Sequence, residues 1–452
     1  MTARSFEFKL IVIFVTFLSR KIIRVNPRIY SQAAVFKRCV MAFAVNLGKG
    51  VFLPQCKEPA FSKSIMRIKP PEVAVVPIFD FGTGAMLPVP RVGENVAKNA
   101  ILAKSKNGAA WVVSPVSGKL RRIERVEHPV VGSVLCAFIN IKDSIPALEV
   151  RGHNPSSMTS AGIIQAARMA CIFDESDGLP LFYKLQKAKR DRVMMTVADG
   201  IDDSPYVSSS LKIISEYGVD CADGLGFILK ALDGGKAVLA AYDPGDLDMD
   251  KVLNTFGFVD VIRVSGGYPA WPRFAEQHCH EKYLRVGVQA LRALSLAVRT
   301  GEPQTETVIT VSGDCIENPC NVVVPTGTTV RHILEQVGLK KPLKYVILGD
   351  TMRGVLCPNL DVPVFPGIRA ITAVSQVERP VEKKCISCGR CVDICPHNLF
   401  PSEAVRMYEN GESANPAMYG GDRCDACGAC TAVCPSGIDV TEIMLGEKGF
   451  GY

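Results

Sequence analysis

Eight of the seventeen cysteines form two copies of one pattern near the C-terminal end of this 452-residue sequence. The first copy is CISCGRCVDICP, from Cys385 to Pro396, and the second is CDACGACTAVCP, from Cys424 to Pro435. Three cysteines spaced in this way bind three corners of an iron-sulfur cube, whereas the fourth cysteine, which precedes a proline, ligates the other cube. The pattern therefore predicts two 4Fe-4S clusters whose fourth ligands are exchanged.

The exchange determines which cysteines we expect on each cluster. They are Cys385, Cys388, Cys391 and Cys434 for one cluster, and Cys424, Cys427, Cys430 and Cys395 for the other. Gly389 and Gly428 lie inside the loops, where backbone must approach the cluster and a side chain would obstruct it. Apolar neighbours would exclude water and help to set the reduction potential. These neighbours are Ile386, Val392, Ile394, Ala426, Val433 and Ile438.

Other uses of the cysteines fit the pattern less well. Zinc takes four tetrahedral ligands, usually from two separated CxxC pairs, and does not require a third close cysteine or a CysPro. A disulfide framework needs an oxidising compartment, whereas low-potential clusters and intracellular thiols imply a reducing one. We expect the nine scattered cysteines to be free thiols. The run His278, Cys279 and His280 is interpreted as an exposed loop, because no complementary CxxC or HxxxH lies nearby.

Basic residues are concentrated at the N-terminus. Residues 1–40 contain eight Lys or Arg and a single acid, which accounts for the whole formal net charge of +7. The rest of the sequence is neutral and shows no electrostatic footprint for a nucleic acid. Leu10 to Leu18 is an apolar run too short to span a bilayer, which needs about twenty residues.

This N-terminal segment has several interpretations. Its basic flank and short apolar centre fit a signal peptide without an evident cleavage site, an organellar transit peptide, or a basic membrane-surface anchor. We favour another interpretation, in which residues 1–40 are not part of the mature protein and synthesis starts at Met41.

Residues 41–150 contain short apolar runs broken by glycine and proline, such as VAVVPIF and HPVVGSVLCAFINI. Such runs predict compact β structure with tight turns. The stretch SPVSGKLRRI, from Ser114 to Ile123, resembles the hairpin of biotinyl and lipoyl-like sandwich domains. We therefore expect a barrel-sandwich-like β domain with a structural role.

Residues 151–302 alternate between strand and helix patterns. Continuous apolar runs at 192–198, 236–242 and 258–264 predict buried parallel strands. Helices are predicted at 207–217 and 221–232, and a further one over YLRVGVQALRALSLAVR, from Tyr283 to Arg299. The pattern predicts a Rossmann-like α/β domain, yet no GxGxxG follows a strand to cradle a phosphate.

Residues 303–378 predict a smaller unit of order ββαββ, which suits a β-grasp domain. Thr329 precedes VRHILEQ and is a plausible cap for its helix. The unit would serve as a docking surface or as a spacer between domains. Residues 379–452 form the twin 4Fe-4S ferredoxin-like domain. The expected fold is therefore multidomain, with β, α/β, β-grasp and iron-sulfur parts.

This order of domains resembles the RnfC family, whose members are subunits of the Rnf electron transport complex. The resemblance extends from Met41 to the end of the chain, and its most specific parts are the cysteine tail and VITVSGDCIENPCNVVVPTGTTVRHILE, from Val308 to Glu335. It implies a peripheral subunit on the cytoplasmic side of the cell (inner) membrane, in a complex that couples electron transfer between NADH and ferredoxin to ion movement. It also implies an α/β domain like the flavin-binding 51-kDa subunit of respiratory complex I, which would bind FMN and NADH.

The sequence departs from this family in three segments. The family's GxGGAGFP loop falls at 170–185, which reads ACIFDESDGLPLFYKL; its phosphate-cradling glycines are missing and three acids are added. The family's NGAECEPY becomes DGIDDSPY, from Asp199 to Tyr206, and YPQGGEKQ survives only as Tyr268 and Pro269. We therefore expect that the fold is kept and that the nucleotide site is lost.

The sequence thus predicts an electron-transfer subunit of an Rnf-type membrane complex with no acid-base or nucleophilic residue. Its partners would be the other Rnf-type membrane subunits and a ferredoxin or cytochrome, and not a nucleic acid. Basic residues beside the cysteine loops would dock an acidic partner or be ordinary solvated charges. They are Lys383, Lys384, Arg390 and Arg423. The alternatives are a soluble Rnf-like adaptor that feeds another reductase, and an NADH-oxidising subunit with an atypical site.

Overall fold

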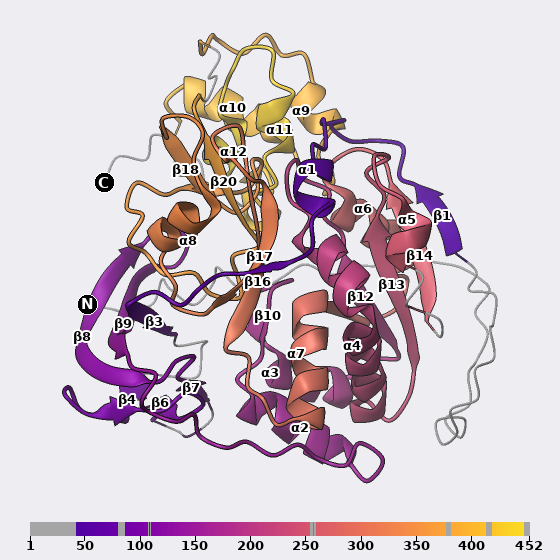
Figure 1. Cartoon of the computed structure of the whole chain (residues 1–452). Coiled ribbons are helices and arrows are strands. Elements are labelled where there is room, and N and C mark those ends of the chain that lie inside the picture. Colours follow the sequence, from indigo (N-terminus) through magenta and orange to yellow (C-terminus); the bar gives the residue numbers. More distant parts are fainter. Residues whose placement is uncertain are drawn as a thin grey trace, which may run out of the picture.

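A computed structural model describes residues 42–79, 86–106, 108, 110–253, 256, 259–376, 381–412 and 418–446. The basic segment 1–40 and the proposed start at Met41 lie outside these residues. The described chain forms a parallel sheet covered by helices, a mixed sheet, a β sandwich and a C-terminal unit of short helices (Figure 1).

Five parallel strands form the sheet of the α/β part, in the order β1-β14-β13-β12-β15. Their bounds are Ala42–Asn46 for β1, Asp260–Ser265 for β14, Lys236–Tyr242 for β13, Met195–Gly200 for β12 and Tyr283–Gly287 for β15. The predicted strands at 192–198, 236–242 and 258–264 correspond to β12, β13 and β14. Their parallel pairing is confirmed.

Helices cover both faces of this sheet. They are α2 (Ser160–Met169), α3 (Leu181–Arg190), α4 (Ser209–Ala231), α5 (Met249–Leu253), α6 (Ala270–His278) and α7 (Val288–Arg299). The helix α6 packs on the face that contains Val197 and Ala240, and the other five pack on the face that contains Ala198 and Leu239. Successive strand residues point to opposite faces. The continuous apolar runs in the sequence therefore contribute side chains to the core on each face of the sheet.

The segment Tyr283–Arg299 corrects a sequence-based prediction, because it is not one helix. It is the edge strand β15 followed by α7. Leu284 and Val286 alternate into the core, and the strand pairs with β12. The alternation of only two apolar residues was hidden by the strong helical spacing that follows it. Gly287 forms the junction and precedes the first helical residue.

The two helices predicted at 207–217 and 221–232 form the single helix α4. Its backbone is non-helical at Tyr217, where φ is −122° and ψ is 24°. The two predicted segments therefore exist, joined at a kink.

The first described strands lie outside the β sandwich. β1 pairs with β14 in the parallel sheet, and β2 (Met66–Arg67) pairs with β17 in the mixed sheet. Between them, the short helix α1 (Glu58–Phe61) follows Lys57, whose side chain is fully buried. Residues 42–67 thus tie the α/β part to the mixed sheet (Figure 1).

The mixed sheet has the order β19-β18-β20-β16-β17-β2. Its strands are β16 (Glu306–Ser312), β17 (Cys320–Pro325), β18 (Tyr345–Leu348), β19 (Val355–Leu356) and β20 (Ala370–Val374). The helix α8 (Val330–Val337) crosses between β17 and β18, as predicted. The Thr329 side chain accepts a 3.4 Å hydrogen bond from the backbone N–H of His332, so the predicted cap is confirmed.

Two antiparallel sheets form the β sandwich, in the orders β3-β9-β8-β5 and β4-β6-β7. The strands are β3 (Val73–Ile78), β4 (Met86–Pro88), β5 (Asn95–Val96), β6 (Ile101–Ser105), β7 (Trp111–Val113), β8 (Gly118–His128) and β9 (Gly132–Ile141). Leu102, Leu120 and Ile139 are buried between the sheets. The sandwich lies at the opposite end of the molecule from the C-terminal unit (Figure 1).

Within the described residues of the C-terminal unit there are four short helices and a 3-10 turn. They are α9 (Arg390–Asp393), α10 (Pro401–Glu409), the turn Gly421–Arg423, α11 (Ala429–Ala432) and α12 (Val440–Met444). Their apolar side chains form a small core around Leu399 and Ile443. Among the helices described, none has both the length and the apolar character that crossing a bilayer requires.

Candidate iron-sulfur centre

The C-terminal unit contains two cavities, each lined by four cysteines. The inner cavity is lined by Cys395, Cys424, Cys427 and Cys430. The outer cavity is lined by Cys385, Cys388, Cys391 and Cys434. Each cavity thus combines three cysteines of one motif with the last cysteine of the other.

The backbone of each cysteine loop is curled by residues with positive φ. Gly389 and Gly428 have φ values of +76° and +78°, and each stands directly before a short helix, α9 or α11. Ser387 and Ala426 also have positive φ, at 51° and 55°. This left-handed backbone is cheap for glycine and costly for other residues. The loops therefore turn tightly enough for their cysteines to face one cavity.

Three of the cysteine sulfurs lie within hydrogen-bonding distance of N–H or hydroxyl groups. The backbone N–H of Ser387 donates to Cys385 Sγ, and that of Leu399 donates to Cys395 Sγ, both at 3.4 Å. The Sγ of Cys430 lies 3.5 Å from Thr441 Oγ1. Hydrogen bonds to sulfur are one of the determinants of cluster potential.

The donor set fits a 4Fe-4S cluster in each cavity, since such clusters are held by four cysteine thiolates. Burial raises the pKa of the Cys391 and Cys424 thiols to about 11. Binding of iron therefore requires that these thiols release their protons. Every cysteine in the described ranges is a free thiol.

No three His, Cys, Asp or Glu side chains in the described part of the chain converge on a point that could hold a single metal ion. The run around Cys279 differs from the exposed loop that we expected. Cys279 is buried against the α/β core, and His278 ends α6 with its ring 5.1 Å from that of Phe274. The apolar strand partners that bury Cys279 come from distant parts of the sequence, so local alternation could not reveal them.

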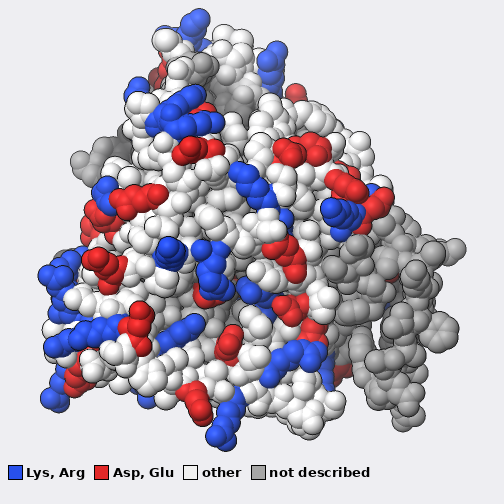
Figure 2. All heavy atoms as spheres, viewed as in Figure 1, with Lys and Arg blue, Asp and Glu red and all other residues white. Residues whose placement is uncertain are grey.

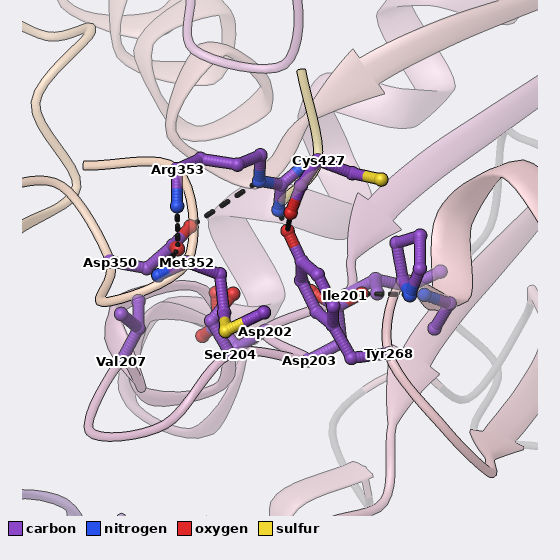
Figure 3. Close-up of polar contacts among 12 residues, drawn as sticks. Ile201, Asp202, Asp203, Ser204, Val207, Tyr268, Asp350, Met352, Arg353 and Cys427 are labelled. Atoms are coloured by element: carbon purple, nitrogen blue, oxygen red, sulfur yellow. Dashed lines mark hydrogen bonds and ion pairs between the residues drawn. The ribbon is translucent and has the colours of Figure 1, made fainter. Parts of the chain in front are cut away.

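The two cavities differ in their surroundings. Cys427 and Cys430 are buried, whereas Cys388 is exposed and its neighbour Ile386 is 66% exposed. The hydroxyl of Tyr268 donates a 2.6 Å hydrogen bond to the backbone carbonyl of Cys427, from a loop of the α/β part (Figure 3). The inner cavity therefore faces the rest of the protein, and the outer cavity faces solvent.

Three family models match separate parts of the chain. The RnfC barrel-sandwich hybrid domain matches residues 45–144, the SLBB domain matches residues 308–356, and the 4Fe-4S dicluster domain matches residues 384–438. In these three parts the chain is similar to proteins of the RnfC family. A 4Fe-4S dicluster domain implies two 4Fe-4S clusters, which agrees with the two cysteine quartets.

Proteins similar to this chain include C subunits of ion-translocating complexes. That of the ion-translocating oxidoreductase complex of Rhodobacter capsulatus is 26% identical over 366 residues, which cover 74% of this chain and 69% of that protein. That of the proton-translocating ferredoxin:NAD(+) oxidoreductase complex of Clostridium ljungdahlii is 26% identical over 379 residues, which cover 78% of this chain and 82% of that protein. The corresponding protein of Pectobacterium atrosepticum is also 26% identical, and the match covers 78% of this chain and 54% of that protein.

A solved structure of an NAD+-reducing NiFe-hydrogenase in the H2-reduced state is similar at 12% identity and a TM-score of 0.40. The match covers 60% of this chain and 53% of that chain.

The segment that replaces the family's glycine-rich loop is folded over the N-terminus of α7. Asp174 and Phe173 form the short strand β10 (Phe173–Asp174), which pairs with β11 (Leu179–Pro180). The Asp174 carboxylate accepts a 2.9 Å hydrogen bond from the backbone N–H of Gly287. Glu175 accepts hydrogen bonds from the backbone N–H groups of Gln289 at 2.7 Å and Ala290 at 3.1 Å. The chain's own carboxylates therefore occupy the first turn of this helix.

Lys184, which the RnfC-family segment retains, is also paired within the chain. Its Nζ lies 2.6 Å from a carboxylate oxygen of Asp174 and 2.7 Å from one of Asp177. The side chains of Lys184 and Asp174 are 6% and 0% exposed, so this pair is closed to solvent. Burial opposes ionisation of Asp174, but the Lys184 ammonium and hydrogen bonds from Ser176 and Gly287 outweigh it and lower the pKa of this carboxyl.

The acids of the segment Asp199–Tyr206 have internal partners too. The Asp199 carboxylate accepts hydrogen bonds from Arg285 Nη2 at 2.6 Å and from Arg285 Nε at 2.9 Å. Asp202 accepts from the backbone N–H groups of Ser210 and Leu211 at the start of α4, and pairs with Arg369. Asp203 accepts a 2.6 Å hydrogen bond from the backbone N–H of Ala270. These carboxylates connect elements of the α/β part to one another and to the mixed sheet.

Sequence reasoning missed Lys57, which reaches the same segment. Its Nζ donates to the backbone carbonyls of Ser204 and of Val207, the latter at 2.9 Å. Burial lowers the pKa of Lys57 to about 8. A lysine before a short apolar stretch is not distinctive in sequence, so no local signal could have singled it out. Tyr268 carried a weak signal, as one of two residues kept from a family segment.

Proposed function

We propose that this chain is an electron-transfer subunit of an Rnf-type ion-translocating complex and relays electrons through two 4Fe-4S clusters. The observation that carries the proposal is the composition of the two cavities, each with three cysteines of one motif and the last of the other. The names of the relatives from Rhodobacter capsulatus and Clostridium ljungdahlii, as subunits of oxidoreductase complexes, support the same role.

In this proposal, Cys385, Cys388, Cys391 and Cys434 ligate the outer cluster, and Cys424, Cys427, Cys430 and Cys395 ligate the inner cluster. A bound 4Fe-4S cluster takes up and releases one electron at a time. The cysteine thiolates hold it, the glycine turns admit it, and the apolar side chains around the inner cavity exclude water. No side chain of the chain needs to transfer a proton for this role.

In this proposal the chain does not receive electrons from a bound nucleotide. The resemblance implies a nucleotide-binding loop at residues 170–185 of the α/β part. A helix N-terminus attracts phosphate through its free N–H groups and its dipole, but Asp174 and Glu175 already accept from the N–H groups at the start of α7. Lys184 is neutralised by Asp174 and Asp177. FMN and NADH therefore do not fit these residues.

The electron partner would then be a protein, such as a ferredoxin or a cytochrome, in addition to the membrane subunits of the complex. Lys383, Lys384 and Arg390 are exposed beside the outer cavity, and such charges favour encounter with an acidic protein. Elsewhere, basic and acidic side chains are interspersed over the face seen in Figure 2, which gives no reason to expect a nucleic acid partner. The proposed location is the cytoplasmic side of the membrane, bound peripherally.

The exchanged ligation can be tested with four serine variants purified under argon. We expect Cys434→Ser and Cys388→Ser to lose the same EPR signal, and Cys395→Ser and Cys427→Ser to lose the other. Cys56→Ser removes an exposed thiol outside the motifs and should keep both signals and about eight irons per chain. If Cys434→Ser instead loses the same signal as Cys427→Ser, the exchanged ligation is wrong.

A further inference from the structure

Two side chains of the α/β part hold the two loops that line the inner cavity. Tyr268 Oη donates to the carbonyl of Cys427 at 2.6 Å. Arg273 Nη2 donates to the carbonyl of Ile394 at 2.8 Å, and Ile394 directly precedes Cys395 in the chain. Cys427 and Cys395 come from different motifs, so the two contacts together fix the spacing of the loops across the inner cavity.

Tyr268 is itself held rigidly. Its side chain is 1% exposed, and its backbone N–H and carbonyl exchange 2.9 Å hydrogen bonds with Val51. The guanidinium of Arg353 lies 5.5 Å from the centre of its ring. Arg353 in turn pairs with Asp203 at 3.6 Å and Asp350 at 3.4 Å (Figure 3). The Tyr268 hydroxyl is therefore already in position to bind the Cys427 carbonyl. Its side chain loses little conformational freedom when a cluster binds.

Arg273 brings a buried positive charge to the same place. It lies on α6 and is 7% exposed, and its Nη1 donates to the carbonyl of Pro269 at 2.8 Å. The outer cavity has a different neighbour: Glu409 Oε1 accepts a 2.8 Å hydrogen bond from the backbone N–H of Cys385. The inner cavity also contains Asp425, which pairs with His397 at 3.2 Å. The outer cavity is lined by Arg390, which is exposed, so the inner site is distinguished by a guanidinium that is buried, that of Arg273.

A third contact to the loop that lines the inner cavity comes from the mixed sheet. The carbonyl of Met352 would lie 2.7 Å from a Cβ placed on Gly428, whereas a Cβ on Gly389 would meet nothing within 4 Å. The two motifs are equivalent in sequence but differ in this respect. The loop with Cys427 is therefore packed between the α/β part and the mixed sheet.

We propose that Tyr268 and Arg273 are positioning residues for the inner cluster, and that the charge of Arg273 favours its reduced form. Reduction adds one electron and one negative charge to the cluster, and a nearby cation stabilises that charge. No proton or bond change is required, and the electron comes from an external one-electron donor. The inference rests on the proposed ligation of the inner cavity and assigns a role to two residues outside the cysteine motifs.

The test is a redox titration of the intact protein under argon, with dithionite as the electron donor and EPR as the readout. The inner signal is the one lost in Cys427→Ser, and the outer signal is the one lost in Cys388→Ser. In Arg273→Gln, we expect the ratio of reduced to oxidised inner cluster at a fixed potential to fall by about tenfold, which is about 59 mV for a one-electron couple. In Tyr268→Phe, we expect a changed line shape of the inner signal, because the Cys427 peptide loses its fixed partner.

Tyr242→Phe is the matched control, because the Tyr242 hydroxyl also donates to a backbone carbonyl, that of Gly266, at 2.7 Å. It should leave both signals unchanged, and the outer signal should be unchanged in all three variants. Unaltered inner signals in both test variants would overturn the inference, as would an equal change in the inner and outer signals. Failure of the ligation proposal is separate, since it would appear as loss of the same EPR signal in Cys434→Ser and Cys427→Ser.

Discussion

The Glu175 carboxylate closes the first turn of α7, where its Oε1 accepts a 2.7 Å hydrogen bond from the backbone N–H of Gln289. A Cβ placed on the preceding Gly287 would lie 2.2 Å from the Glu175 carboxyl carbon, so the carboxylate reaches the helix only because residue 287 has no side chain. A helix N-terminus is an anion site, and here carboxyl oxygens of the chain itself accept from its N–H groups. Asp174 and Glu175, in the segment where the resemblance implies a phosphate loop, are thus bound within the fold.

Glu175 should make stability depend on pH. Burial, together with the Asp174 carboxylate, raises the pKa of Glu175 from 4.5 to about 8 in the folded protein. A group that binds its proton more tightly when folded contributes stability that is fully present below its unfolded pKa and is lost as pH rises through its folded pKa. We therefore expect the Tm of the unmodified protein to fall by several degrees relative to Glu175→Gln between pH 5 and pH 8.

Thermal unfolding at four pH values in this range checks the prediction. Glu281→Gln changes an exposed glutamate and should follow the unmodified protein at every pH. A constant difference in Tm between Glu175→Gln and the unmodified protein would contradict the account.

The two loop glycines should respond differently to alanine. Both have positive φ, so each substitution costs about 1–2 kcal/mol of backbone strain. Gly428→Ala adds a clash with the Met352 carbonyl, at 2.7 Å, that Gly389→Ala does not. We expect Gly389→Ala to keep both EPR signals with a slightly lower Tm, and Gly428→Ala to lose the inner signal and about four irons. Equal iron contents in the two variants would count against the packed inner loop.

Charge reversal near the outer cavity should slow electron delivery. In the double variant Lys383→Glu with Lys384→Glu, we expect reduction by an acidic ferredoxin to slow by about tenfold at low ionic strength, with a smaller effect at about 0.15 M salt. Stopped-flow absorbance measures the rate. Lys119→Glu reverses an exposed charge on β8, in the distant sandwich, and should leave the rate unchanged. If both variants slow reduction equally, the basic residues beside the outer cavity are not a docking site.

Patterns confined to short stretches of sequence predicted much of this fold. The run Lys236–Tyr242 was predicted as a strand with the bounds that β13 has, and Thr329 was predicted as a helix cap. For the strand and the cap the determining residues are neighbours in the chain, so spacing and residue type were sufficient. The cysteine spacing predicted an exchanged ligation of two clusters, which stays a prediction; the same quartets line the two cavities.

Contacts between distant residues were not predictable in this way. β1 joins a strand more than two hundred residues away, and Tyr268 and Cys427 are 159 residues apart. The buried Lys57 is bound by backbone carbonyls, which every residue has, so no residue type indicates its partner. The loss of glycines at 170–185 could be read from the sequence, but not that Asp174 and Glu175 would turn inward to α7.

In our proposal, two cysteine-bound clusters carry electrons through this chain, and the α/β part binds no nucleotide. The most direct measurement is the iron, sulfide and flavin content of protein purified under argon, followed by titration with NADH and then dithionite, observed by absorbance and EPR. We predict about eight irons per chain, no flavin, no reduction by NADH and full reduction by dithionite. Stoichiometric FMN with rapid bleaching by NADH would contradict the account.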